Sequence, residues 1–307
     1  MKITIIGASQ IAFSTAWGIC HSELAQQINF YNDTQSVIKR GNRTANLQNT
    51  LSNSIEDMTL ATAICASDTQ ISLTNKSEEL SDSDVVIFLP TSLPYGFHSS
   101  QALKTTNLSV TRQIVPKIQE HIQNAIILIA IPYANYIAAW IHQKHGLINI
   151  IGIANGVSTA HLKSEIANRL GISVKDVSAL AIGNDEVTHP LTQYCRVNGI
   201  PLSQLMHESD IQSLSETVAE RCPYTSASDF TLASHILQVV SSISLDKKRV
   251  MSVGTRISTD TTSVFLNVPS KIGSNGIENI IPLELTDTQT EQFKELVAQS
   301  AASQNYS

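Results

Sequence analysis

Cysteine is scarce in this chain, and no two cysteines lie close together in the sequence. The four are Cys20, Cys65, Cys195 and Cys222, and none belongs to a C-x-x-C motif. Zinc sites and disulfide frameworks require patterned cysteines, so the sequence favours neither and we expect no metal site. Scattered thiols suit a reducing compartment, and we expect a cytoplasmic protein.

Long hydrophobic runs and basic clusters are also missing. No apolar run approaches the ~20 residues that a membrane span needs, and the N-terminus lacks the regions of a signal peptide. The net charge of −6 without a basic stripe argues against nucleic acid and anionic membranes as partners. What remains, with 42% hydrophobic residues among 307, is a globular chain of one large or two medium domains that binds a small molecule.

The first seventeen residues predict a strand, a tight turn and a helix. Lys2 to Ile6 are β-branched and apolar, Gly7 interrupts the run, and helical spacing follows. In a dinucleotide-binding βαβ unit, glycines at this turn let the backbone approach a pyrophosphate, which sits on the free N–H groups of the helix start. Here the segment Gly7-Ala8-Ser9-Gln10-Ile11-Ala12 keeps only the first glycine of the motif G-x-G-x-x-G/A.

The same turn supports two interpretations. In the first, Gly7, Ser9, Gln10 and Ile11 bind a dinucleotide, although the Ser9 side chain would push a pyrophosphate outward unless its hydroxyl donates a hydrogen bond. In the second, the turn is purely structural. The motif predicts the fold more strongly than it predicts the cofactor.

A second predicted strand, Ile28 to Tyr31, ends at Asn32 and Asp33. A carboxylate at this strand end usually receives the ribose hydroxyls of NAD, so both residues are candidate ribose contacts. The alternative is a turn built from Asn and Asp. Because no arginine adjoins them to mark a 2′-phosphate, the sequence leaves NAD and NADP equally open as cofactors.

Alternating strands and helices continue through the first half of the chain, which predicts a doubly wound parallel sheet of the Rossmann type. The expected elements are a helix over 34–52, a weak strand over 62–73, a strand over Asp84–Leu89, a loop over Pro90–Thr106, a helix over Leu108–Gln123 and a strand over Ala125–Ile131.

The pattern of strands and helices in the second half predicts an α+β domain. We therefore expect residues 1–147 to form the dinucleotide-binding domain and residues 148–307 to form the C-terminal domain. A polar tail is expected from Ser303 to Ser307. The other expected elements are helices over Ser158–Leu170, Asp210–Arg221, Ser228–Leu245 and Gln289–Ala301, strands over Val177–Ile182, Arg249–Ile257 and Val264–Val268, a hairpin around Asn198-Gly199 and a turn over Gly273–Gly276.

Several separate stretches resemble the lactate/malate dehydrogenase family in order and spacing over nearly the whole chain. These stretches are MKITIIGAS, SDSDVVIF, RQIVPKIQEHIQNAIILI, VSALAIGN, RVNGIPL, KKRVMSVG and KIGSNGIENIIPLEL. The resemblance implies a Rossmann-type sheet followed by an α+β domain, an NAD(P)-linked hydride transfer, and a homodimer or homotetramer. Within it, Arg196 matches a family position outside the chemistry.

The positions at which the family carries its chemistry differ in this chain. The loop arginine aligns near Ser100, the asparagine before the strand-closing proline is Ile131, and the orienting aspartate and clamping arginine are Ser158 and His161. Asp185 stands where the proton-donating histidine is expected. Reduction of a 2-oxo acid needs a proton donor and cations for the carbonyl and the carboxylate, so we expect negligible turnover of lactate or malate.

The polar residues that remain have a catalytic and a structural interpretation. His161 and Asp185 are expected in the cleft between the domains, where a histidine and a carboxylate could perform acid–base chemistry with His189 nearby. The alternative is that they are solvated residues in a disused cleft. His98 and Lys104 are the cationic or titratable residues near the loop after the fourth strand, and their role stays open.

Two functions of different classes follow from this sequence. The chain is either a diverged NAD(P)-linked oxidoreductase whose substrate is less anionic than a 2-oxo acid, or a pseudoenzyme kept for metabolite binding, regulation or scaffolding. Cofactor affinity separates the two.

Overall fold

The structure is a computed structural model, and it describes residues 1–32, 47–90, 99–153, 156–220, 229–258 and 263–306. Three residues singled out from the sequence, Asp33, His98 and Cys222, lie outside these ranges. No described helix combines the length and the apolar run that crossing a bilayer would require.

A parallel sheet forms the first half of the molecule, as the sequence predicts. Its strand order is β3-β2-β1-β4-β5-β6, the doubly wound order in which ligands bind at the carboxyl ends of the strands where the order reverses. The strands are β1 (Lys2–Ile6), β2 (Gln27–Tyr31), β3 (Gln70–Thr74), β4 (Val85–Phe88), β5 (Ile126–Ile129) and β6 (Ile150–Gly152).

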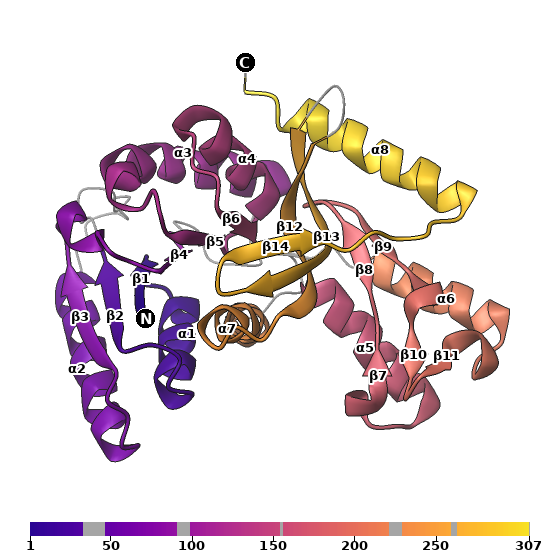
Figure 1. Cartoon of the computed structure of the whole chain (residues 1–307), viewed down its shortest axis with the longest axis horizontal. Coiled ribbons are helices and arrows are strands. Elements are labelled where there is room, and N and C mark those ends of the chain that lie inside the picture. The colour runs from indigo at the N-terminus through magenta and orange to yellow at the C-terminus, as the bar shows by residue number, and fades with distance from the viewer. Residues whose placement is uncertain (33–46, 91–98, 154–155, 221–228, 259–262, 307) are drawn as a thin grey trace.

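Helices cover both faces of this sheet because successive strand residues point to opposite sides. Ile3, Ile5 and Ile87 pack against α1 (Gln10–His21), α2 (Leu47–Ile64) and α7 (Asp229–Ser244). Ile6, Val86 and Phe88 pack against α3 (Ser100–Ile118) and α4 (Ala134–His145). Figure 1 shows α3 and α4 on one side of the strands and α1 and α7 on the other.

Antiparallel strands from the second half extend the same sheet. Gly254 of β12 pairs with Gly152 of β6, and β12 then pairs along its length with β13. The added strands are β8 (Ala181–Gly183), β9 (Thr188–Pro190), β12 (Arg249–Ser258), β13 (Ser263–Gly273) and β14 (Gly276–Ile280). The division into domains 1–147 and 148–307 stays a prediction.

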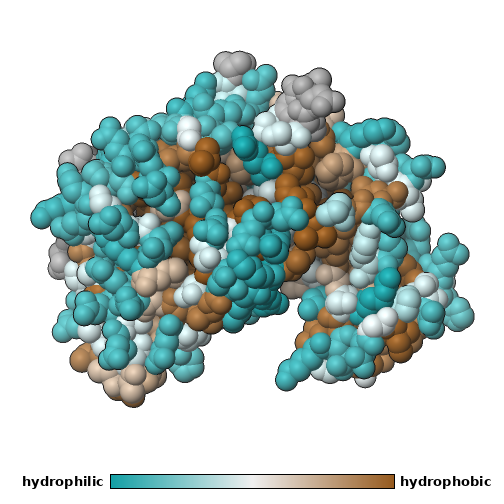
Figure 2. All heavy atoms as spheres, in the orientation of Figure 1, coloured by the Kyte–Doolittle hydropathy of each residue, from teal (hydrophilic) through white to brown (hydrophobic). Residues whose placement is uncertain are grey.

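Figure 2 shows that hydrophobic residues reach the viewed face mainly between the elements of the first and second halves.

A smaller sheet and three helices complete the fold. The small sheet has the order β11-β10-β7. The remaining elements are β7 (Val177–Ser178), β10 (Arg196–Val197), β11 (Ile200–Pro201), α5 (Gly156–Leu170), α6 (Glu208–Ala219) and α8 (Asp287–Ser303).

The expected strand over 62–73 is wrong in its first part. Of the helix expected over 34–52, residues 34–46 lie outside the described ranges and 47–52 belong to α2, which runs from Leu47 to Ile64, and β3 begins only at Gln70. Leu51, Ile55, Met58 and Thr62 are buried at helical spacing, so the 3.6-residue period continues through residues whose β-branched character had favoured a strand.

The expected loop over Pro90–Thr106 is also too long, because α3 begins at Ser100. The Ser99 hydroxyl accepts a hydrogen bond from the Ala102 N–H at 3.3 Å and caps the helix. Leu103 and Asn107 then face the core. Lys104 therefore lies on a helix.

One predicted strand of the second half needs correction. The single strand expected over Val177–Ile182 is two short strands, because β7 pairs with β10 and β8 pairs with β13. Within the polar tail expected from Ser303, Gln304 is 3% exposed, and its side-chain amide hydrogen-bonds to the backbone of Phe265. The helix α4 and the strands β6, β9 and β14 were not expected. The hairpin around Asn198-Gly199 is confirmed, with both residues at positive φ.

Replacing Gln304 should weaken the fold. Its Oε1 accepts from the Phe265 N–H at 2.8 Å and its Nε2 donates to the Phe265 carbonyl at 3.0 Å. Gln304→Ala is expected to lower the free energy of unfolding by about 2 kcal/mol, because both buried backbone groups lose their partner. Urea unfolding measures the change. Gln299→Ala, on the exposed face of α8, is the control, and equal effects of the two variants would contradict the bridging role.

Candidate functional site

The turn after β1 requires glycine. Gly7 has φ of +112°, and a Cβ at this position would come within 2.6 Å of the Leu89 carbonyl oxygen at the end of β4. The carboxyl ends of β1 and β4 therefore approach each other closely at the edge where the strand order reverses. Ligands of doubly wound sheets bind at this edge, and the binding of a dinucleotide by Gly7 stays a prediction.

Ser9 caps α1, a role that the sequence analysis did not predict. Its Oγ accepts from the Ala12 N–H at 3.3 Å, so its hydroxyl hydrogen can be donated outward to an oxyanion. Gln10 is exposed, whereas the Ile11 side chain is 2% exposed and packs in the core. Gln10 can thus contribute its side chain to a ligand, and Ile11 can contribute only its backbone.

Asn32 follows β2 at the same edge of the sheet. Its backbone N–H donates to the Thr74 carbonyl at 3.1 Å, which ties the end of β2 to β3, and its side chain is half-buried. A ribose contact by Asn32 stays a prediction.

Asp185 caps a helix that lies fifty residues earlier in the chain. Its Oδ1 accepts from the Asn135 N–H at 3.0 Å and its Oδ2 from the Tyr136 N–H at 2.8 Å. Asp185 is 6% exposed. Tyr133, at the N-cap position of α4, has left-handed backbone angles and provides no capping side chain, so Asp185 replaces the local cap. These contacts hold α4 against the turn between β8 and β9.

His161 lies on α5, one turn after Ser158. The buried Ser158 Oγ is 3.1 Å from the Thr188 Oγ1 on β9, so the face of α5 that carries both residues is directed toward the β8–β9 hairpin that also carries Asp185. His189, on β9, is half-buried, and burial lowers the pKa of its imidazole despite the nearby Glu295 carboxylate. Acid–base pairing of His161 with Asp185 stays a prediction.

The two other changed positions, Ile131 and Ser100, have different environments, and Lys104 lies one turn from the second. Ile131 is 1% exposed and packs in the core beside α3 and α4, and Ser100 is exposed at the start of α3. Lys104, one turn after Ser100, is half-buried, and its Nζ lies 4.3 Å from the centroid of the Tyr136 ring. The ammonium group of Lys104 is thus directed toward the first turn of α4.

Sequence reasoning missed His235, on α7. A Cβ on Gly156, the first residue of α5, would come within 2.2 Å of the His235 ring. The Nδ1 of His235 is buried and has no hydrogen-bond partner in the described part of the chain, and burial lowers the pKa of the imidazole to about 4. Only the apolar stripe of α7 was visible in the sequence, because the contact with Gly156 depends on how α5 and α7 pack.

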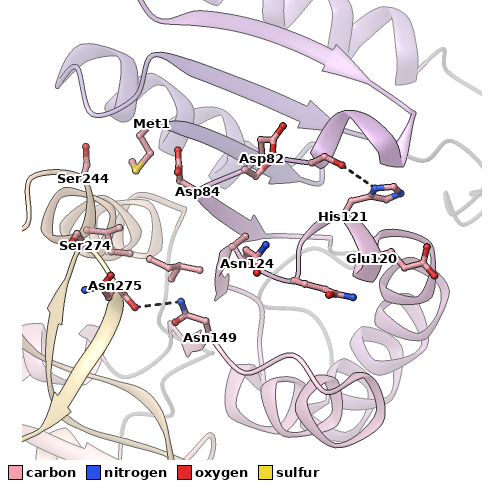
Figure 3. Close-up of a pocket in the computed structure, with 16 residues that line it drawn as sticks. Met1, Asp82, Asp84, Glu120, His121, Asn124, Asn149, Ser244, Ser274 and Asn275 are labelled. Atoms are coloured by element: carbon pink, nitrogen blue, oxygen red, sulfur yellow. Dashed lines mark hydrogen bonds between the residues drawn. The ribbon is translucent and has the colours of Figure 1, made fainter.

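A cavity of about 1050 Å³ lies at the opposite, amino edge of the sheet. Figure 3 shows Asp82, Asp84, Glu120 and His121 around it, with His121 Nδ1 3.1 Å from the Ser81 hydroxyl. None of the predicted cofactor or catalytic residues lines this cavity. Ligands of open α/β sheets bind at the carboxyl edge, so we do not assign the predicted chemistry to it.

Within the described ranges, the side chains that commonly bind metal ions do not form a metal site. No three His, Cys, Asp or Glu side chains gather as ligands within the described ranges. Cys20 and Cys195 are free and buried, and burial raises the pKa of each thiol to about 11, which makes both thiols poor nucleophiles.

Comparison with known proteins gives one consistent result. The chain is 26% identical to a malate dehydrogenase of Pelodictyon phaeoclathratiforme, covering 97% of this chain and 96% of the relative. It is 25% identical to a malate dehydrogenase of Nitrosococcus oceani, covering 96% and 94%. No protein-family model matches the chain.

Solved structures agree in fold. The malate dehydrogenase of Cryptosporidium parvum has a TM-score of 0.83 at 22% identity, covering 99% of this chain and 97% of that one. The lactate dehydrogenase of the same organism, solved with lactic acid and β-nicotinamide adenine dinucleotide, has a TM-score of 0.84 at 21% identity, covering 99% and 96%. These similarities extend over both halves of the chain.

Removing the Asp185 carboxylate should destabilise the protein. Asp185→Ala is expected to lower the free energy of unfolding by about 3 kcal/mol, because two amides at the start of α4 lose a charged acceptor. Asp185→Asn should cost less, since its amide oxygen can still accept one bond. Chemical denaturation measures both, with the exposed neighbour change Glu186→Ala as the control. A loss below ~0.5 kcal/mol for Asp185→Ala would contradict the capping role.

His235 should make stability depend on pH. In the unfolded chain the imidazole of His235 is protonated below pH ~6.5. In the folded protein its pKa is about 4, so it stays neutral until the pH falls to that value. Stability contributed by the neutral ring is therefore present above pH ~6.5 and is lost as pH falls, at up to ~1.4 kcal/mol per unit. Urea unfolding at pH 7, 6 and 5 should show a smaller fall for His235→Gln than for the unmodified protein. The variant His207→Gln, at an exposed position, should leave the fall unchanged, and equal slopes for all three proteins would refute the assignment.

Proposed function

We propose that this chain, which is lactate/malate dehydrogenase-like over nearly its whole length, is an NAD(P)-linked oxidoreductase that acts on an altered substrate. The named relatives are malate dehydrogenases. One observation supports the proposal: the turn at Gly7 leaves no room for a Cβ and is followed by the capped start of α1, as a dinucleotide site requires, while the positions that would grip a 2-oxo acid hold other residues.

The described residues fit a dinucleotide at the carboxyl edge of the sheet. Gly7 keeps the turn free of a Cβ, the N–H groups at the start of α1 face the edge, and Ser9 retains a hydroxyl hydrogen for a phosphate oxygen. Gln10 and the Ile11 backbone would complete this side, with Asn32 at the ribose, and Asp33, the other proposed ribose contact, lies outside the described residues. The bound nicotinamide would accept or deliver a hydride.

A classical 2-hydroxy acid dehydrogenase is a poorer fit. A two-pronged arginine contact grips a carboxylate, and the corresponding position is His161, while Ile131 and Ser158 are buried side chains of the packed structure. Losing an arginine clamp and a general acid, each worth several kcal/mol in the transition state, should leave negligible turnover of lactate and malate. The substrate is therefore a less anionic carbonyl compound or alcohol.

His161 and Asp185 have different roles in this proposal. The two oxygens of Asp185 accept from the backbone of α4, so Asp185 acts mainly by holding α4 in place. His161, on the face of α5 directed toward the β8–β9 hairpin, is our candidate for the proton donor. We also propose that the chain assembles as a homodimer or homotetramer, which light scattering after size exclusion would test.

The alternative is a pseudoenzyme that keeps the fold for metabolite binding, regulation or scaffolding. The observation that favours it is the packing of Ile131 and Ser158, which fill their sites without needing a ligand. Under this alternative the chain binds no nicotinamide cofactor tightly.

Cofactor titration decides between the two. We expect NADH or NADPH to bind below millimolar concentration, seen as a change in nicotinamide fluorescence. Gly7→Ala should weaken that binding at least tenfold, because the new Cβ meets the Leu89 carbonyl and displaces the turn. Gly171→Ala, which also has positive φ but open space around it, is the matched control. Absence of binding by both cofactors, or ordinary turnover of lactate or malate, would refute the proposal.

A further inference from the structure

Lys104 is held over aromatic rings at the carboxyl edge of the sheet. Its Nζ lies 4.3 Å from the centroid of the Tyr136 ring and 5.7 Å from that of the Tyr133 ring. Tyr133 and Tyr136 belong to the first turn of α4, directly after β5, whereas Lys104 belongs to the second turn of α3, which follows β4. The ammonium therefore bridges the carboxyl ends of two adjacent strands.

The charge of Lys104 is not matched by a carboxylate. Within the described ranges its contacts are the two ring faces, and no acidic side chain lies within ion-pair distance of its Nζ. The face of a ring attracts an ammonium group more weakly than an oxygen that carries negative charge. A half-buried ammonium of this kind can thus turn to such an oxygen when a ligand presents one.

The helix α3 sets the position from which the Lys104 side chain extends. Because α3 begins at the cap Ser99, Lys104 lies on regular helix, one turn after Ser100, where the resemblance places the lost loop arginine. Helical attachment and aromatic walls limit the rotamers of a long side chain, and a site built on rigid elements is more effective than one on a loop.

We propose that Lys104 binds the carbonyl oxygen of the substrate and stabilises the alkoxide that forms there. This inference rests on the proposed oxidoreductase function. Hydride transfer to the carbonyl carbon moves the π electrons of the C=O bond onto oxygen, and a proton then completes the alcohol. A lysine is a point charge without the fork that an arginine offers to a carboxylate, so the substrate class is a neutral aldehyde or ketone.

Arg112 provides a matched control on the same helix interface. Its guanidinium lies 5.9 Å from the centroid of the Trp140 ring, so it makes the same kind of contact between α3 and α4 as Lys104, two turns further along. Lys104→Met and Arg112→Met should both lose a cation–π contact and change the melting temperature by similar small amounts. Only the first should affect ligand binding at the carboxyl edge.

The experiment measures binding of an unreactive carbonyl compound to the protein saturated with reduced cofactor. Isobutyramide is the probe, because its amide oxygen is rich in negative charge and cannot accept a hydride under these conditions. We expect isobutyramide to change the nicotinamide fluorescence of the unmodified protein, with an affinity that falls about tenfold or more in Lys104→Met. Lys104→Arg should retain most of the affinity, and Arg112→Met all of it.

Two controls make the outcome decisive. Oxamate carries the same amide with an added carboxylate, and tenfold tighter binding of oxamate than of isobutyramide would overturn the assignment of a neutral substrate. Equal isobutyramide binding by Lys104→Met and the unmodified protein, or none by the latter, would overturn the role of Lys104. Each variant is first titrated with NADH and NADPH, so failure of cofactor binding, which removes the proposed function, is recognised separately.

Discussion

The first turn of α4 is the constraint on which the arrangement of the site depends. Tyr133 adopts left-handed backbone angles, which are unfavourable for a bulky side chain, and no local side chain caps the helix. The Asp185 carboxylate supplies the cap from the β8–β9 turn. A strained turn in the first half of the chain is thus stabilised by a buried charge from the second half, and this joins the two halves at the carboxyl edge of the sheet.

Other contacts meet at the same turn. The Tyr136 ring packs against the Tyr306 ring with centroids 5.0 Å apart, and the Tyr306 hydroxyl donates to the Tyr136 carbonyl. Burial raises the pKa of the Tyr306 phenol, so it stays a neutral donor. The Lys104 Nζ of α3 also lies over the Tyr136 ring, so the C-terminal tail, α3 and the β8–β9 turn all contact this one residue of α4. Their positions are therefore coupled.

Local sequence patterns were sufficient to predict β1, β4 and β5 of the sheet, but not β6, β9 or β14. The strands β1, β4 and β5 are short apolar runs bounded by Gly7, Pro90 and Pro132, and their alternation with helices indicated a parallel sheet. The turn at Gly7 was predictable from the strand and helix patterns on either side of it, whereas its close approach to Leu89 arises only when β1 pairs with β4. By contrast, the residue that caps α4 is fifty residues away in sequence. Lys104 was predicted to lie in the loop over Pro90–Thr106, whereas it lies on α3. Contacts such as His235 with Gly156 arise only from helix packing.

The similarity in fold to malate and lactate dehydrogenases does not by itself show that this chain performs their reactions. Ile131 packs in the core, Ser158 bonds to Thr188 and Asp185 caps a helix, so these changed positions contribute to a stable structure without any ligand. A scaffold of this kind can lose the groups that grip an acid and remain folded. Function must then be argued from the groups that packing does not explain. Lys104, with a charge that no described carboxylate balances, is the clearest of these at the edge where a cofactor would lie.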